Sequence, residues 1–81
     1  MRLDKYLKVA RIIKRRTVAN EACDAAHVTV NGRPAKASYD VKVGDLIEVT
    51  FGARALKIRV LEIKETVGKD AAASLYEVVD S

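Results

Sequence analysis

The sequence contains too few reactive side chains for most kinds of chemical site. Its 81 residues include one cysteine, one histidine, one proline and no tryptophan. A single cysteine cannot form an internal disulfide, and no cluster of ligands suggests a metal site. No nucleophile is paired with a base, and no carboxylates are paired for acid–base work. We therefore expect no enzyme, no cofactor and no metal, with Cys23 as a small core residue and His27 in a structural or solvated role.

Long apolar runs are lacking as well. No stretch approaches the ~20 apolar residues that a membrane-spanning helix needs. Lys or Arg interrupts the N-terminal segment about every three residues, which leaves no hydrophobic core for a signal peptide. A lone cysteine suits a reducing compartment. The sequence predicts a cytoplasmic protein.

Positive charge is present in excess, and it is concentrated at one end of the chain. The first eighteen residues hold seven of the fifteen Lys and Arg residues and a single acidic residue, which gives them a charge of +6, whereas the remaining residues carry −2. A local basic patch of this kind is typical of a surface that binds a polyanion. The seven basic residues are Arg2, Lys5, Lys8, Arg11, Lys14, Arg15 and Arg16.

Two helices are predicted in the basic third. Leu3, Tyr6, Leu7 and Ala10 have the spacing of one helical face, so the first helix is amphipathic. A second helix is expected to begin at an N-cap on Thr17 and to run to about residue 26. Its side chains are small and would allow close approach of a neighbour. We therefore expect this second helix to be the inner one.

Strands are predicted after position 27, where the hydrophobic period changes from 3.6 to 2. Asn31-Gly32 is typical of a tight hairpin turn, and residues 65–74 are expected to form a mobile loop or one short helical turn. The strands are expected at 28–30, 35–37, 46–51, 55–63 and 75–79. The prediction is a single α+β domain over 1–81, in which an N-terminal two-helix RNA-binding hairpin packs on a small, curled, mostly antiparallel sheet.

The second helix indicates which nucleic acid the patch would bind. A DNA-reading helix-turn-helix presents Asn, Gln and Arg on its second helix, whereas this helix is rich in alanine and should expose Asn20, Glu21 and Asp24 to water. Because an acidic face repels phosphate, contact must come from the first helix, the turn and the start of the second helix. This arrangement favours recognition of RNA shape and backbone.

The RNA hypothesis depends on the cationic groups gathering on one surface of the folded chain. Arg2 and Arg16 should then point in a common direction and remain free of internal carboxylate partners. The hypothesis would fail if the two arginines pointed in unrelated directions or were locked into internal carboxylate pairs.

Four short motifs together resemble the S4-type RNA-binding domain, with a motif core of about 1–51. They are Arg2-Leu3-Asp4 with Leu7, Arg16 with Ala19, Val28-x-Val30-Asn31-Gly32, and Val41 with Gly44-Asp45-x-Ile47-x-Val49. The opening MRLDKYLKVARIIKRRTVA and the later NGRPAKAS are similar to the RqcP (YabO-like) family of stand-alone domains. Ala26 departs from the family pattern, which usually has glycine at the end of the second helix.

This resemblance implies a non-enzymatic factor of ribosome-associated quality control. Such proteins bind large ribosomal subunits obstructed by a peptidyl-tRNA, contact large-subunit rRNA and hold the tRNA in the P site. They act with RqcH, which adds an untemplated alanine tail to the stalled chain. Arg2 and Arg16 match the RNA-contacting arginines of the family. The other five basic residues are added from the charge pattern alone, and the small size with Pro34 at a sheet edge favours a monomer.

Two other functions remain open. The chain resembles a small heat-shock protein of the same domain type, and a protein of that kind would bind free large subunits or another structured RNA or tRNA. That relative carries a longer basic C-terminal extension, whereas this sequence ends in Val-Val-Asp-Ser. The basic residues would alternatively dock on an acidic protein, in which case nuclease treatment would leave the complexes intact.

Overall fold

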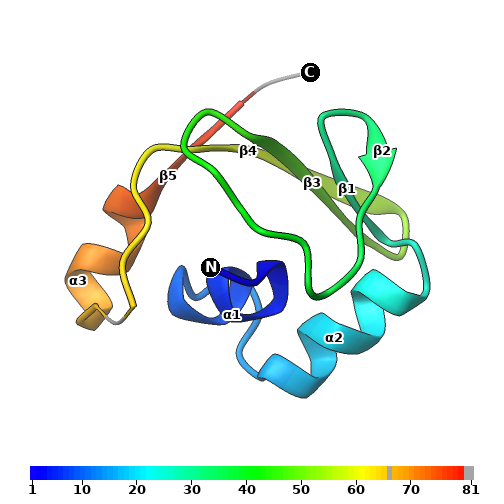
Figure 1. The fold of residues 1–81 in the computed structure, drawn as a ribbon, viewed down its shortest axis with the longest axis horizontal. Helices are drawn as coiled ribbons and strands as arrows, with labels where there is room; N and C mark the ends of the chain where they lie inside the picture. The colour runs from blue at the N-terminus through cyan, green and yellow to red at the C-terminus, as the bar shows by residue number, and fades with distance from the viewer. Residues whose placement is uncertain (66, 80–81) are drawn as a thin grey trace.

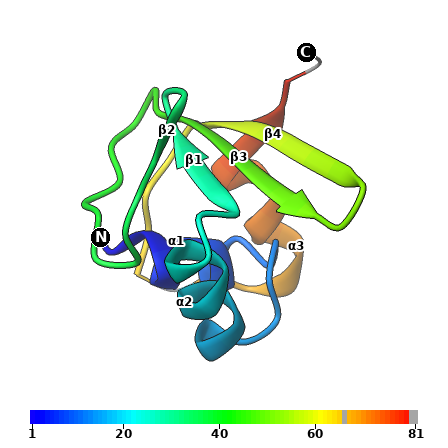
Figure 2. The same ribbon diagram turned by 90° about the vertical axis from the view of Figure 1, so that its right-hand side faces the viewer.

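The computed structural model describes residues 1–65 and 67–79 and places the helices beneath one face of a curved sheet (Figures 1 and 2). The sheet has five strands in the order β2-β1-β3-β4-β5, and every neighbouring pair is antiparallel. The predicted α+β class is confirmed. The elements are α1 (Leu3–Val9), α2 (Arg16–Asp24), β1 (Val28–Val30), β2 (Arg33–Pro34), β3 (Leu46–Phe51), β4 (Arg54–Val60), α3 (Lys69–Ala72), the 3-10 helix η1 (Ala73–Leu75) and β5 (Tyr76–Val78).

The inner helix is α1, so the prediction that α2 lies inside is wrong. Leu3, Tyr6 and Leu7 of α1 are fully buried, and the Tyr6 hydroxyl donates to the carbonyl of Leu75 at 2.8 Å. In α2 only Ala19 and Cys23 are buried. Large side chains remove more apolar area from water than small ones, and this difference explains why α1 lies under the sheet. The prediction of Cys23 as a core residue is confirmed.

The start of α2 also differs from the prediction. Arg15 occupies the N-cap position with extended backbone angles, and its carbonyl accepts the N–H of Ala19. Thr17 therefore lies inside the first turn, and the prediction of an N-cap there is wrong. Arginine is a good helix former, so the helix can begin at Arg16 and does not need the hydroxyl side chain of Thr17 as its N-cap.

Both N-terminal helices end on a residue in the left-handed region. Arg11 follows α1 with a φ of 59°, and Ala26 follows α2 with a φ of 61°. After α2, the N–H of Ala26 donates to the carbonyl of Cys23 and the N–H of His27 to that of Ala22. This pair of hydrogen bonds is a Schellman motif, which glycine usually closes.

The strands agree with the prediction in the middle of the chain and deviate beside the turns. β1 and β3 have their predicted bounds, and Asn31 and Gly32 form the predicted hairpin turn, both with positive φ. The return strand is β2, so the expected strand at 35–37 is wrong. The strand expected at 55–63 is β4, which begins at residue 54 and ends at residue 60, and β5 lies within the expected 75–79.

The chain changes direction where β4 ends. The N–H groups of Leu61 and Glu62 both donate to the carbonyl of Leu75, at 2.8 and 3.1 Å. Two successive donors on one acceptor interrupt the regular ladder. Within 65–74 the predicted short helical turn is found, as α3 and the start of η1, while position 66 lies outside the described residues.

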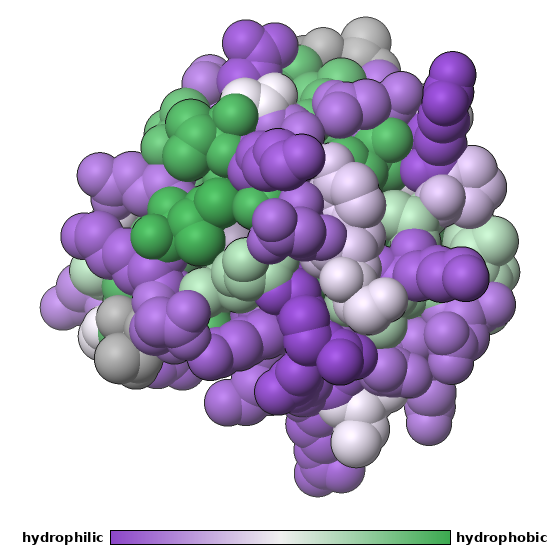
Figure 3. Space-filling model, viewed as in Figure 1, coloured by the Kyte–Doolittle hydropathy of each residue, from purple (hydrophilic) through white to green (hydrophobic). Residues whose placement is uncertain are grey.

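Hydrophilic side chains cover most of the face seen in Figure 3, above all over α1 and α2, and hydrophobic side chains gather mainly in its upper half. In the described part of the chain, no helix has the length and apolar character to cross a membrane.

Candidate nucleic-acid interface

Arg2 is held in place by a segment far along the chain. The N–H of Leu3 donates to the carbonyl of Tyr39 at 2.8 Å, and the N–H of Val41 donates to the carbonyl of Met1 at 2.8 Å. The terminal amino group donates to Asp40 at 2.7 Å. These bonds join the N-terminus to residues 37–41 as a short antiparallel pair, so Arg2 has a defined backbone position. No local sequence pattern indicates this pairing.

A buried carboxylate fixes residues 37–41 in turn. Asp45 is 8% exposed and accepts hydrogen bonds from the Tyr39 hydroxyl at 2.9 Å, the Lys42 N–H at 2.9 Å and the Asn31 amide at 3.2 Å. The Asn31 side chain also accepts the N–H of Leu46 at 3.0 Å, which links the network to β3. The sheet therefore supports the segment that positions the N-terminus.

The basic turn between the helices is anchored by two isoleucines. The N–H groups of Ile12 and Ile13 both donate to the carbonyl of Leu7, and Ile13 is 6% exposed. The chain between this anchor and α2 carries Lys14 and Arg15, both exposed. The turn therefore projects its cations into solvent because its apolar residues point inward.

Arg2 and Arg16 meet at the carboxylate of Asp4. Arg2 donates from Nε to Oδ1 at 3.1 Å and from Nη2 to Oδ2 at 3.3 Å, and Arg16 donates from Nε to Oδ2 at 3.3 Å. Asp4 also accepts the N–H of Lys5 at 2.8 Å and the amide of Asn20 at 3.4 Å. Burial raises the pKa of Asp4, but these hydrogen bonds lower it by more, and the net shift is downward.

This arrangement confirms one part of the expectation about the two arginines and contradicts the other. Arg2 and Arg16 converge, as expected. They are not free of internal carboxylates, and that expectation is wrong, because Asp4 is 1% exposed and pairs with both. The pairing nevertheless leaves about half of each arginine side chain in solvent, since the two side chains are 50% and 46% exposed. Arginine has five N–H donors, and Asp4 takes two from Arg2 and one from Arg16.

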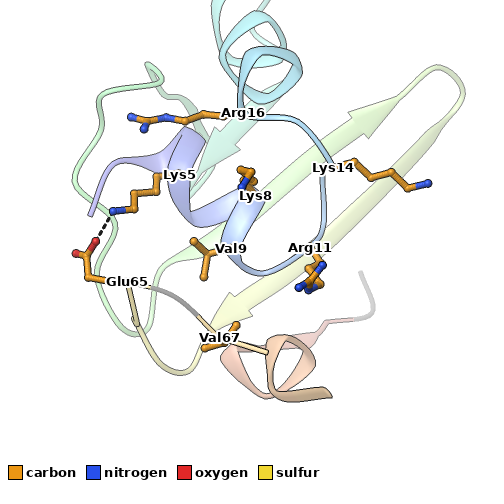
Figure 4. A pocket seen from close by; sticks show the side chains of 8 residues that line it. All are labelled: Lys5, Lys8, Val9, Arg11, Lys14, Arg16, Glu65 and Val67. Atoms are coloured by element: carbon orange, nitrogen blue, oxygen red, sulfur yellow. Dashed lines mark hydrogen bonds and ion pairs between the residues drawn. The ribbon is translucent and has the colours of Figure 1, made fainter. Parts of the chain in front are cut away.

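Five of the seven predicted basic residues line one hollow of about 720 Å³, shown in Figure 4. Arg16 and Lys5 point to one side of this hollow, Lys14 points to the other, and Lys8 and Arg11 lie between them. Arg16 also lines a second hollow together with Arg2. The five residues of the first hollow are Lys5, Lys8, Arg11, Lys14 and Arg16.

Arg15 is exposed but lines neither of these hollows, so the structure does not bring it together with the other six. Asn20 was expected to face water, but it is half-buried and bonded to Asp4, and that expectation is wrong. Glu21 and Asp24 are exposed, as expected. The acidic outer face of α2 is therefore confirmed.

The segment after β4 contributes two residues to the main hollow that no sequence pattern indicated. Glu65 forms an ion pair with Lys5, and the pairing lowers the pKa of the exposed Glu65 carboxyl. Val67 lies on the same side of the hollow as Val9, a half-buried residue of α1 that packs against the core (Figure 4). Val9 therefore lies among the basic residues of α1 and faces this distant segment (Figure 4). Glu65 and Lys5 are sixty positions apart, so sequence spacing offered no signal.

Across the described residues, no group of three or more His, Cys, Asp or Glu side chains is placed to hold a metal ion. The side chains at the site are instead cations on short, separately anchored segments. Such a surface can bind phosphates by charge and by paired arginine hydrogen bonds.

A family model described as the S4 domain matches residues 1–47. The chain is also similar, over nearly its whole length, to bacterial proteins named RQC P-site tRNA stabilizing factor. The protein of that name from Streptococcus pneumoniae is 54% identical over 79 residues, which are 98% of this chain and 90% of that one. The one from Bacillus subtilis is 49% identical over 79 residues, which are 98% and 92% of the two chains.

Solved structures of similar fold include Heat Shock Protein 15 from Vibrio cholerae, described as trimeric. It superposes with a TM-score of 0.91 at 32% identity and covers 98% of this chain and 81% of that one. A hypothetical protein solved in solution has a TM-score of 0.85 at 30% identity and covers 100% and 99% of the two chains. The Heat shock protein 15 homolog of Aeromonas salmonicida is 37% identical over 82 residues, and the match spans 62% of its length.

Proposed function

Because this chain belongs to the S4-domain family of RQC P-site tRNA stabilizing factors, we propose that it is an RNA-binding factor of ribosome-associated quality control. Its task in this proposal is to stabilise tRNA in the P site, as the name of its relatives describes. The finer proposal is that it binds large subunits obstructed by a peptidyl-tRNA, contacts large-subunit rRNA and supports alanine tailing by RqcH. It works as a non-catalytic factor in the cytoplasm.

The observation that carries this proposal is the gathering of cations around α1. Five basic side chains and one carboxylate line the main hollow, and Arg16 joins it to the hollow that contains Arg2. A surface with this balance of charge attracts a polyanion and releases its counterions. On α2, Asp24 lies outside both hollows, whereas Glu21 borders the hollow that contains Arg2. We propose all seven basic residues of the opening segment as the contact set, with Arg2 and Arg16 at its centre.

Sedimentation with defined ribosomal particles tests the proposal. Wild-type protein is expected to migrate with large subunits that carry a peptidyl-tRNA and to bind empty large subunits more weakly. Lys8→Ala should weaken that binding several-fold, because Lys8 is exposed and lines the hollow. Arg59→Ala is the matched control, because it removes the same charge from an exposed position on β4. Equal binding by all three proteins would refute the proposed surface.

A nuclease arm and a tailing arm complete the experiment. Nuclease digestion of the RNA should release the protein, and a complex that survives digestion would indicate an acidic protein partner instead. In cells that contain RqcH, loss of this protein should reduce alanine tails on stalled chains, and Lys8→Ala should restore them only in part. Unchanged tailing without the protein would refute the RqcH part of the proposal alone.

A heat-shock-type function is the second candidate, and the likeness to Heat Shock Protein 15 favours it. A protein of that kind would bind free large subunits or another structured RNA. The two candidates predict different binding to large subunits that carry no peptidyl-tRNA. Binding that is equally tight with and without the peptidyl-tRNA would select the second candidate.

A further inference from the structure

Asp4 lies at the centre of the arginine pair, and we propose that it is a positioning residue that presents Arg2 and Arg16 to phosphate as one unit. The inference rests on the proposed RNA-binding function and adds a residue that the basic pattern does not contain. In this inference, the negatively charged Asp4 strengthens the binding of a polyanion.

The hydrogen bonds around Asp4 leave its carboxylate little freedom. It accepts five N–H donors, of which two come from Arg2 and one each from Arg16, Asn20 and the backbone of Lys5. A carboxylate has about four lone-pair sites, so its acceptor capacity is filled. Rotation of the group would break several of these bonds together. Asp4 therefore holds both guanidinium groups by their Nε edges.

The opposite edges of the two guanidinium groups remain available. Asp4 engages neither Nη1 of Arg2 nor either Nη atom of Arg16, and both side chains are about half exposed. Because an arginine edge with two parallel N–H groups matches the oxygens of a phosphate, the pair is placed to grip phosphate from the solvent side. The rotamer entropy of two long side chains is then lost on folding and not on binding.

Positioning and simple electrostatics predict opposite effects for Asp4→Asn. Loss of a carboxylate makes the surface more positive, and charge alone would then tighten RNA binding. If Asp4 orients the arginines, the same substitution frees both side chains and weakens RNA binding. The sign of the change therefore decides between the two explanations.

Glu65→Gln provides the matched control, because it removes a carboxylate charge from the hollow that Arg16 also lines. Glu65 pairs with Lys5 and is largely exposed, so its loss should tighten binding, as charge alone predicts. Asp4→Asn should weaken binding of peptidyl-tRNA-bearing large subunits by roughly two- to tenfold for each arginine that it releases. Tighter binding by Asp4→Asn, in the manner of Glu65→Gln, would overturn the inference.

A double-mutant cycle separates positioning from a general structural defect. In an Arg16→Ala background, Asp4→Asn should cost less binding than in the wild type, because one of its two partners is already gone. An equal loss in both backgrounds would overturn the inference. Asn20→Ala gives a milder change without altering charge, and it should weaken binding by a smaller factor. All binding is measured well below the melting temperature of each variant.

The same set of measurements distinguishes this inference from the proposed function. Failure of the wild-type protein to bind any RNA-containing particle would refute the function. Binding by the wild type together with tightening by Asp4→Asn would refute only the positioning role.

Discussion

Arg11→Gly should stabilise the fold and weaken RNA binding at the same time. Arg11 has a φ of 59° at the end of α1, a conformation that costs a residue with a Cβ about 1–2 kcal/mol. Glycine removes this cost but makes the unfolded chain more flexible, which offsets about 0.5–1 kcal/mol. The expected net gain is about 0.5–1 kcal/mol. For a chain of this size, that corresponds to a rise of about 3–6 °C in melting temperature.

The loss of binding follows from the position of the Arg11 side chain. Arg11 is exposed and lines the main hollow beside Lys8. If its guanidinium neutralises one phosphate, its removal should reduce the slope of log affinity against log salt by about 0.7–0.9. Affinity should fall several-fold at low salt and by a smaller factor at high salt. Circular dichroism melting and RNA binding at several salt concentrations provide the two measurements.

Ala26→Gly is the control for the backbone effect. Ala26 has nearly the same φ, 61°, and occupies the same position after its helix, but it lies outside both basic hollows. Ala26→Gly should raise the melting temperature as much as Arg11→Gly does and should leave RNA binding unchanged. A rise in melting temperature for Ala26→Gly alone would refute the strain argument for Arg11. Undiminished RNA binding by Arg11→Gly would remove Arg11 from the contact set.

Three further predictions follow from buried polar groups. The folded pKa of Asp4 lies below its ordinary value of ~3.9, so ionised Asp4 should stabilise the fold above that value and cease to do so as the pH falls through the folded pKa. In urea unfolding, the free energy of unfolding should therefore fall less steeply with acid for Asp4→Asn than for the wild type. Burial raises the pKa of Cys23 to about 11, so iodoacetamide should modify Cys23 slowly in the native protein at pH 8 and rapidly in urea. Tyr6→Phe should cost only about 1 kcal/mol in urea unfolding, because the carbonyl of Leu75 keeps two backbone donors.

The parts of the fold that could be predicted are those with a local signal. The apolar spacing in α1, the alternation in β1 and β3 and the Asn31-Gly32 turn each depend on residues next to one another in the sequence. The wrong predictions concern segments whose structure is determined by contacts with residues far away in the sequence. The return strand β2 ends at Pro34 and not at 37, because the chain beyond it turns aside to pair with the N-terminus.

The basic residues of the candidate site could be predicted from the sequence, but the residues that hold them in place could not. The run of basic residues identified six side chains that line the two hollows. Asp40, which supports the N-terminus, and Glu65, which pairs with Lys5, are distant in sequence from the residues they contact, so no spacing argument could find them. Asp4 could have been found, because it is the one acidic residue of the basic segment and directly follows Leu3 of the predicted apolar face. A buried carboxylate requires hydrogen-bond partners, and basic residues lie on both sides of Asp4 in the sequence.

The two halves of the basic surface have separate supports, and this separation has a consequence for stability and binding. Residues 37–41 hold Arg2, while Ile12 and Ile13 hold the turn that leads to Arg16. The helix α1 connects these supports, through its buried side chains and through Asp4, which bonds to both arginines. Loosening the 37–41 segment should therefore displace Arg2 and spare the cations of the turn. Loosening α1 should instead separate the two arginines, because it removes the element that sets their spacing.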